Sequence, residues 1–239
     1  MPPSSKKLIV VTGGSRGIGK AIIHKFVRHG FDVVSCARSE FGLKLLEEDL
    51  VELRPEAKIY TLAADLSTKE GVSAFATYVK SLNRKVDVLV NNTGFFAPGQ
   101  IHSEAEGVLE NMINTNLYSA YHLTRSLVKD MIALQEGYIF NICSTASIIP
   151  YVNGGSYCIS KYALYGMTKV LREEMKEHNI RVTAILPGPT LTASWDGVNL
   201  PPDRFVKSED IAETIFGAYS LSNHSVIEEI VIRPQLGDI

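Results

Sequence analysis

The amino-acid sequence predicts an α/β protein in which one doubly wound parallel sheet of seven strands is covered by helices on both faces. Short apolar runs of strand length alternate with helical patterns along the whole chain. A glycine-rich turn at 13–19 joins the first of these runs to the first helical pattern. With 239 residues, 45% of them hydrophobic, the chain can bury one large core. We expect a single domain, residues 1–239, with strand order 3-2-1-4-5-6-7.

The first expected strand, 8–12, leads directly into the glycine-rich turn and then into a helical pattern over 20–29. Glycines permit a tight turn, let the backbone approach a pyrophosphate, and let the helix pack close to the strand. The N–H groups of the helix N-terminus then face the phosphates. The order of elements predicts a Rossmann-like dinucleotide site, although the glycine spacing is not G-x-G-x-x-G; a purely structural turn is the alternative. The expected cofactor contacts are Gly13, Ser15, Arg16, Gly17, Ile18 and Gly19.

The end of the second expected strand, 31–36, bears on the choice of cofactor. Sites that prefer NAD(H) usually place Asp or Glu here to bond the ribose 2′-OH, but this sequence continues with Ala37 and Arg38. Arg38 and Arg16 together suit a 2′-phosphate, because the planar guanidinium binds its oxygens bidentately. We therefore predict NADP(H) as the preferred cofactor, with NAD(H) possible. The alternative is that Arg38 is a solvated loop residue.

The remaining segments continue the alternation. The other expected strands are 58–63, 86–90, 138–143, 180–186 and 227–232. The expected helices are 43–53, one that begins near 67–70, two within 104–129 that break near 114–116, then 163–178 and 208–219, the last with Ser208 as its N-cap. Between the last two helices, 190–206 follows a strand end and lacks helical periodicity, so we expect a substrate-covering loop there.

Polar residues and glycines follow several of the expected strands, where a parallel sheet of this kind binds ligands. These residues are Asp65 with Leu66, Asn92 with Gly94, Ser144, and Pro187, Gly188 and Thr190. Asp65 would either bond the adenine amino group or cap the next helix. The Asn92–Gly94 segment would serve a ligand, a hydrogen-bonded turn, or both. Asn116, at the break between two helices, is either a cap or a site residue.

Tyr157 and Lys161 are four residues apart at the head of a helical pattern. At that spacing both side chains lie on one helix face, so the phenol and the ammonium can share one space. A nearby cation favours phenolate and would lower the tyrosine pKa towards working pH, which suits a proton donor and acceptor. The pair alone is also compatible with an ordinary surface helix. Motifs elsewhere in the chain are therefore needed to distinguish a functional pair from a coincidence.

Composition argues against several other classes of protein. The net charge of −2 offers no electrostatic basis for binding nucleic acid or an anionic membrane. Three cysteines without paired spacing argue against a disulfide scaffold or a zinc site and fit a reducing cytoplasm. The six histidines show no ligand spacing, so no metal is expected. No apolar run reaches the length of a membrane span, and 1–7 reads as a short tail without a signal core.

These motifs, taken in order, resemble the short-chain dehydrogenase/reductase family over nearly the whole chain. Residues 12–19 are similar to its T-G-x-x-x-G-x-G loop, and 91–94 to its N-N-A-G motif, with Thr93 in place of alanine. Asn116, Ser144, Tyr157 and Lys161 fall on its Asn-Ser-Tyr-Lys tetrad. Their joint occurrence at compatible intervals makes chance very unlikely, and it favours a functional Tyr157–Lys161 pair.

The resemblance implies a role for each residue. Tyr157 would exchange a proton with the substrate oxygen, Lys161 would lower the Tyr157 pKa and bond the nicotinamide ribose, and Ser144 would hydrogen-bond the substrate oxygen. Asn116 would hold a water of the proton relay. Asp65 and Leu66 would frame the adenine, Asn92 and Gly94 would flank the ribose, and Thr190 would reach the nicotinamide side. A homodimer through the helices near 117 and 157, or a homotetramer, is also implied.

We therefore expect an NADP(H)-dependent oxidoreductase that acts on a small carbonyl or secondary-alcohol substrate. The glycine loop and the Tyr–Lys region resemble 3-oxoacyl-thioester reductases. The C-terminal segment, 228–235, departs from them and is closer to members that act on small 3-hydroxy acids or on varied carbonyls. The alternatives are a non-catalytic NAD(P)-sensing protein and another reaction on the same scaffold, such as epimerisation or dehydration.

Overall fold

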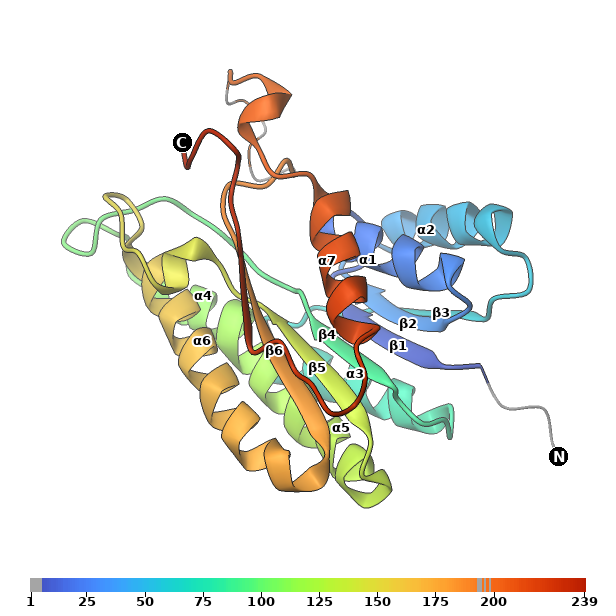
Figure 1. Ribbon diagram of the computed structural model, residues 1–239. Coiled ribbons are helices and arrows are strands. Elements are labelled where there is room, and N and C mark those ends of the chain that lie inside the picture. Colours follow the sequence, from blue (N-terminus) through green and yellow to red (C-terminus); the bar gives the residue numbers. More distant parts are fainter. Residues whose placement is uncertain (1–5, 193–194, 196, 198) are drawn as a thin grey trace, which may run out of the picture.

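One parallel sheet with strand order β3-β2-β1-β4-β5-β6-β7 organises the computed structural model, which describes residues 6–192, 195, 197 and 199–239 (Figure 1). This confirms the predicted fold and strand order. Residues 1–5 of the predicted tail at 1–7 and positions 193–194, 196 and 198 of the predicted substrate loop lie outside the described residues. The strands are β1 (Leu8–Thr12), β2 (Asp32–Ala37), β3 (Ile59–Ala63), β4 (Val88–Asn91), β5 (Gly137–Ile142), β6 (Ile180–Pro187) and β7 (Glu229–Ile232).

Helices cover both faces of this sheet. The described α-helices are α1 (Gly17–Arg28), α2 (Glu40–Leu53), α3 (Lys69–Ser81), α4 (Val108–Ile113), α5 (Ser119–Leu134), α6 (Gly155–Met175) and α7 (Ser208–Tyr219). A core cluster joins one sheet face to α1, α2 and α7, and a second joins the other face to α3, α5 and α6 (Figure 1). Successive β1 residues alternate between them: Ile9 and Val11 lie in the first cluster, Leu8 and Val10 in the second. Burial on both faces explains why the strands read as continuous apolar runs.

The structure corrects several predicted boundaries. Helix α6 begins at Gly155, eight residues before the expected start at 163, so Tyr157 lies within its first turn. The predicted break near 114–116 is a π-helix, Asn114–Tyr118, between α4 and α5. Ser208 is not the N-cap of α7: it is the first helical residue, Lys207 precedes it, and the Ser208 Oγ has no hydrogen-bond partner. A helix boundary depends on local backbone geometry, which composition alone places only approximately.

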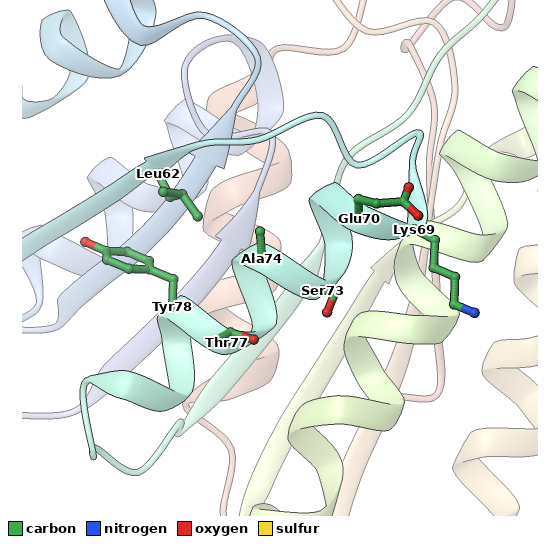
Figure 2. Close-up of a pocket in the computed structure, with 7 residues that line it drawn as sticks. All are labelled: Leu62, Lys69, Glu70, Ser73, Ala74, Thr77 and Tyr78. Atoms are coloured by element: carbon green, nitrogen blue, oxygen red, sulfur yellow. The ribbon is translucent and has the colours of Figure 1, made fainter.

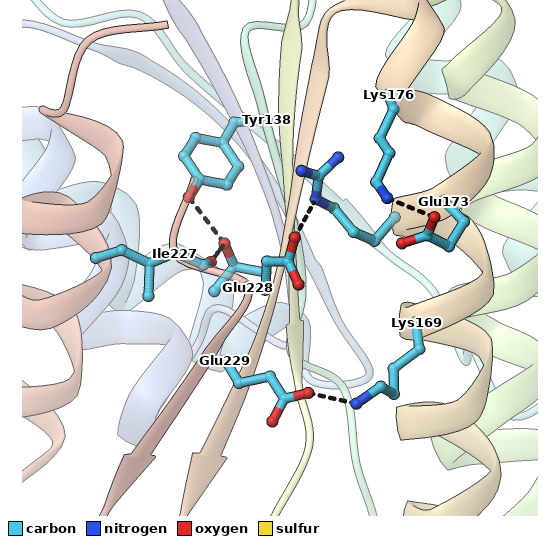
Figure 3. Close-up of polar contacts among 9 residues, drawn as sticks. Tyr138, Lys169, Glu173, Lys176, Ile227, Glu228 and Glu229 are labelled. Atoms are coloured by element: carbon cyan, nitrogen blue, oxygen red, sulfur yellow. Dashed lines mark hydrogen bonds and ion pairs between the residues drawn. The ribbon is translucent and has the colours of Figure 1, made fainter. Parts of the chain in front are cut away.

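Contacts along α6 join this helix to the edge strand β7 and to the residue before it (Figure 3). Lys169 Nζ lies 2.6 Å from the Glu229 carboxylate, and Arg172 Nε lies 3.2 Å from that of Glu228. The segment that leads into β7 is thereby tied to the helix that carries Tyr157 and Lys161. Among the described residues, the structure contains no helix both long and apolar enough to cross a membrane.

Candidate active site

The turn between β1 and α1 leaves a set of backbone N–H groups available to an anion. Gly13 and Gly17 have φ of +69° and +56°, a region that side chains disfavour. A Cβ at Gly19 would lie 2.4 Å from the Gly13 carbonyl oxygen, so this close packing also requires glycine. Helix α1 starts at Gly17, and Arg16 at its N-cap contributes no side-chain cap. The first-turn N–H groups therefore have no helical acceptor, which fits the pyrophosphate of a dinucleotide.

The end of β2 lies beside this turn, and β3 lies next to β2. Arg16, Arg38 and Asp65 are all exposed. The pKa of Asp65 is lowered, mainly by the hydrogen bond from the Ser67 N–H at 3.0 Å and to a smaller extent by the charge of Arg38. Asp65 does not cap α3, because Thr68 fills that position. Both arginines thus remain accessible at the rim, while the Leu66 side chain is buried in the core.

Asn92 holds the glycine turn in place. Its Nδ2 donates to the carbonyl oxygens of Thr12, at 2.9 Å, and Gly13, at 3.1 Å. In return, the Thr12 hydroxyl accepts from the backbone N–H groups of Asn92 and Thr93, each at 2.9 Å. The end of β4 is therefore joined to the end of β1 by four hydrogen bonds. These bonds support the alternative in which the Asn92 segment forms a hydrogen-bonded turn. Its expected contact with the ribose stays a prediction.

Asn116 lies fully buried in the π-helix and connects two segments of the site. Its Oδ1 accepts from the Phe95 N–H at 2.6 Å, and its Nδ2 donates to the Phe95 carbonyl at 2.9 Å and to the Ser160 Oγ at 2.8 Å. The amide thus bonds the loop after β4 on one side and α6 on the other. Because both ends of the amide have these protein partners, Asn116 does not act as a helix cap, and its role in the site stays a prediction.

Ser144, Tyr157 and Lys161 converge from β5 and α6. The hydroxyl of Ser144 hydrogen-bonds the side chain of Tyr157, and this contact favours the phenolate. The ring of Phe96, from the loop after β4, meets the Tyr157 ring edge to face at 4.9 Å between centroids. Lys161 is buried, its Nζ donates to the Ile142 carbonyl at 2.9 Å, and it lies 5.8 Å from the centroid of the Tyr157 ring. Serine, phenol and ammonium thus share one space at the carboxyl edge of the sheet.

The prediction that Lys161 lowers the pKa of Tyr157 is wrong, because this pKa is raised. Burial raises the pKa of Tyr157 to about 12, and the Ser144 hydrogen bond only partly opposes this. Burial likewise lowers the pKa of Lys161 to about 8. Desolvation penalises the charged form of each group and is the largest cause of both pKa shifts. At neutral pH the tyrosine is therefore protonated and the lysine remains mostly charged.

The turn after β6 contacts the C-terminal segment. The Gly188 N–H donates to the Ile232 carbonyl at 2.7 Å, and a Cβ at Gly188 would lie 2.8 Å from Asp238 Oδ1. Thr190 is buried, and its hydroxyl donates to the Gly188 carbonyl at 2.9 Å. A Cβ at Gly17 would lie 3.2 Å from the Thr192 side chain, so this loop also reaches the glycine turn. Pro187, Gly188 and Thr190 thus lie at the same sheet edge as the other predicted residues.

A shallow depression on α3 lies apart from these residues (Figure 2). It is lined by Leu62 of β3 and by Lys69, Glu70, Ser73, Ala74, Thr77 and Tyr78. None of the predicted catalytic or cofactor residues is among them. The depression is open to solvent and contributes nothing to the arrangement around Tyr157.

Sequence reasoning missed three residues that shape the site. Ser39 caps α2 by accepting from the Gly42 N–H at 3.0 Å, directly after Arg38. Ser160 joins Asn116 to α6. Glu104 accepts from the Ser156 N–H at 3.0 Å and from its hydroxyl. The Ser39 cap was available as a serine three residues before Gly42 at the start of a helical pattern. The other two contacts join distant segments and have no local signal.

The fold is a doubly wound sheet with a glycine turn at a helix N-terminus, and a serine, a tyrosine and a lysine meet at the same sheet edge. These features are typical of Rossmann-fold enzymes that bind a dinucleotide cofactor. The family model described as short chain dehydrogenase matches residues 7–202. The chain therefore belongs to the short-chain dehydrogenase/reductase family. The sepiapterin reductase of Chlorobaculum tepidum is 31% identical over 241 residues, covering 98% of this chain and 98% of that protein.

Solved structures give the same result. A metagenomic short-chain oxidoreductase in complex with NADP is 33% identical, with a TM-score of 0.82, and the match covers 96% of this chain and 97% of that one. The L-sorbose reductase of Gluconobacter frateurii, complexed with NADPH and L-sorbose, is 28% identical, with a TM-score of 0.88 and coverage of 96% of both chains. The protein is an oxidoreductase that acts on carbonyl or CH–OH groups with NAD(P).

Proposed function

We propose that the protein is an NADP(H)-dependent carbonyl reductase or alcohol dehydrogenase that interconverts a ketone and a secondary alcohol. The convergence of Ser144, Tyr157 and Lys161 at the edge of the sheet carries this proposal. The bound cofactor supplies or accepts the hydride. Its phosphates would be held by the first turn of α1, where the N–H groups lack helical acceptors.

The protein's own residues would handle the proton. Tyr157 is protonated at neutral pH, so its phenol would donate to the oxygen of a ketone during reduction and accept that proton back during oxidation. Ser144 would donate a hydrogen bond to the same oxygen and stabilise the charge that develops there. The charged Lys161 would offset the phenolate left behind. The Asn116 amide is engaged by Phe95 and Ser160, so we propose that its side chain positions these segments.

Replacing Tyr157 tests this assignment. Tyr157→Phe keeps the ring that packs against Phe96 and removes only the hydroxyl. We expect turnover to fall by at least about 10²-fold while NADPH affinity stays within about twofold, because a positioned proton donor contributes on the order of 10²–10⁴ in rate. Retained turnover in the variant would show that another group donates the proton. NADPH binding without turnover in the wild type over a broad ketone and alcohol panel would favour a sensing protein.

The exposed Arg38 supports NADPH over NADH as the preferred cofactor. Loss of a charge-assisted contact to the 2′-phosphate costs about 1.5–3 kcal/mol, so Arg38→Asp should weaken NADPH binding by roughly 10- to 100-fold and change NADH binding little. Fluorescence titration measures both. Arg28→Asp serves as the control, because Arg28 is also exposed and lies at the far end of α1. Equal losses for both cofactors would refute a 2′-phosphate role.

Apolar side chains near the tetrad support an uncharged ketone as substrate. Phe95, Ile148, Ile149, Tyr151 and Leu191 are between 38% and 48% exposed, and they belong to the loops after β4, β5 and β6. Such a wall suits an aliphatic or aromatic carbonyl compound. 3-Oxoacyl thioesters and small 3-hydroxy acids are narrower options, which a panel of matched neutral and charged substrates would separate.

Exposed apolar residues on two helices support a homo-oligomer. Tyr118 directly precedes α5, and Tyr121 lies in the first turn of that helix. Ile159, Tyr162 and Val170 lie on α6. All five side chains are at least 40% exposed. Pairing of these faces would bury them in a homodimer, or in one interface of a homotetramer. Light scattering of the wild type and of Tyr162→Glu would test this.

The three cysteines are unpaired and buried, which supports a cytoplasmic location.

A further inference from the structure

The helix that carries Tyr157 and Lys161 starts without a local cap. Gly154 at its N-cap position offers no side chain, and residues 155–157 form the first turn. The carboxylate of Glu104, 52 residues earlier, fills this role instead. Its Oε1 accepts from the Ser156 N–H at 3.0 Å, and its Oε2 accepts from the Ser156 hydroxyl. A negative charge at this end also complements the helix dipole.

The fit around Glu104 requires two glycines. A Cβ at Gly155 would lie 2.1 Å from Glu104 Oε1, and a Cβ at Gly99 would lie 2.6 Å from Glu104 Cγ. The two segments also pair directly, because the Gly99 N–H donates to the Asn153 carbonyl at 2.9 Å. Neither glycine could carry a side chain without displacing the carboxylate. The contact between the loop after β4 and the start of α6 is therefore built closely around Glu104.

The same loop contacts the catalytic residues at two other points. Phe95 is bonded to Asn116 through both its N–H and its carbonyl. The ring of the next residue, Phe96, packs against the ring of Tyr157. The loop is thus attached at three points, to Asn116 in the π-helix through Phe95 and to the first turn of α6 through Phe96 and Glu104. Tyr157 directly follows Ser156, so a shift of that turn moves the phenol relative to Ser144.

We propose that Glu104 is a positioning residue that holds Tyr157 in register with Ser144 by capping the first turn of α6 from the loop after β4. This rests on the proposed carbonyl reductase function. Glu104 touches neither Tyr157 nor Ser144 through any described hydrogen bond, and it acts through Ser156. Because the loop also carries Phe95 and Phe96, the attachment links the segment that contacts Asn116 and Tyr157 to the placement of the proton donor.

Three variants test the proposal. Glu104→Ala removes both contacts and should lower kcat by roughly 10- to 100-fold, in line with the rate lost when reacting groups shift by about 1 Å. Glu104→Gln keeps an acceptor for the Ser156 N–H and should recover most of that loss. Glu106→Ala, an exposed glutamate in the same loop, should leave kcat unchanged. All rates are expressed per NADPH-binding site, and these sites are counted by fluorescence titration. A loss of folded protein therefore does not change the kcat values that are compared.

A merely structural role predicts a different pattern. If Glu104 only stabilises the fold, Glu104→Ala lowers the number of NADPH sites while kcat per site stays at the wild-type value, and the proposal is overturned. Equal loss in the alanine and glutamine variants overturns it too. Hydrogen exchange needs no substrate: the amides of 155–158 should exchange about tenfold faster in Glu104→Ala than in Glu106→Ala. Unchanged exchange at these amides would refute the capping role of Glu104 even if no carbonyl substrate were found.

Discussion

Replacing Lys161 by methionine should stabilise the protein while it removes the ammonium to which we assign a catalytic role. Lys161 is only 4% exposed, and burial lowers its pKa from 10.5 to about 8. The difference of roughly 2.5 in pKa, at about 1.4 kcal/mol per pKa unit, corresponds to about 3–4 kcal/mol for keeping this lysine charged at pH 7. Loss of the hydrogen bond to the Ile142 carbonyl returns about 1 kcal/mol of that.

The net gain of about 2–3 kcal/mol should raise the Tm of Lys161→Met by about 4–12 °C for a chain of this size. The effect has a definite pH dependence. The folded-state pKa lies below the unfolded one, so between pH 8 and 10.5 the unfolded wild type binds more protons, and the wild type gains stability as pH rises. The difference between the two proteins is therefore largest below pH 8 and closes towards pH 10.5.

Thermal unfolding of both proteins, followed by circular dichroism from pH 6.5 upward, measures this difference. Lys169→Met, on the same helix but with an exposed ammonium, serves as the control and should show no comparable gain. A lower Tm for Lys161→Met at pH 7 would refute the reasoning. So would a gain that stays constant up to pH 10.5, because it would then come from packing rather than from burial of charge.

Two further substitutions test the geometry of the site. Asn116→Ala leaves the buried partners of the amide without hydrogen bonds, so it should lower the free energy of unfolding by about 2–4 kcal/mol in urea titrations; a loss below about 1 kcal/mol would contradict its linking role. Gly19→Ala places a Cβ 2.4 Å from a backbone oxygen of the glycine turn, so NADPH binding should be lost in titrations, whereas Gly166→Ala, where a Cβ meets nothing within 4 Å, should bind normally.

Sequence reasoning predicted the fold because its signals are local. Continuous apolar runs identified strands that are buried on both faces, and the glycine turn identified the first crossover. The structure also brings Ser144, Tyr157 and Lys161 together, because the first follows a strand and the other two share a helix face. Each of these placements follows from periodicity and from the rule that parallel strands end at one edge.

Other features depended on contacts that no local pattern reveals. The start of α6 lies eight residues before the predicted one, because the group that caps its first turn at Ser156, Glu104, is distant in sequence. The pKa of Tyr157 was predicted in the wrong direction, because helical spacing shows a neighbouring charge but does not show the depth of burial. Ser208 resembled a cap by residue type, yet its hydroxyl has no partner.

The measurement that tests the central proposal most directly is the transfer of deuterium from NADPH labelled at nicotinamide C4. Wild-type protein and Tyr157→Phe would be incubated with this cofactor and a panel of uncharged ketones, and the alcohols would be analysed by mass spectrometry. We predict deuterium on the carbinol carbon with the wild type and essentially none with Tyr157→Phe, although both proteins bind NADPH. Tight NADPH binding by the wild type without deuterium transfer to any carbonyl would contradict the proposed function.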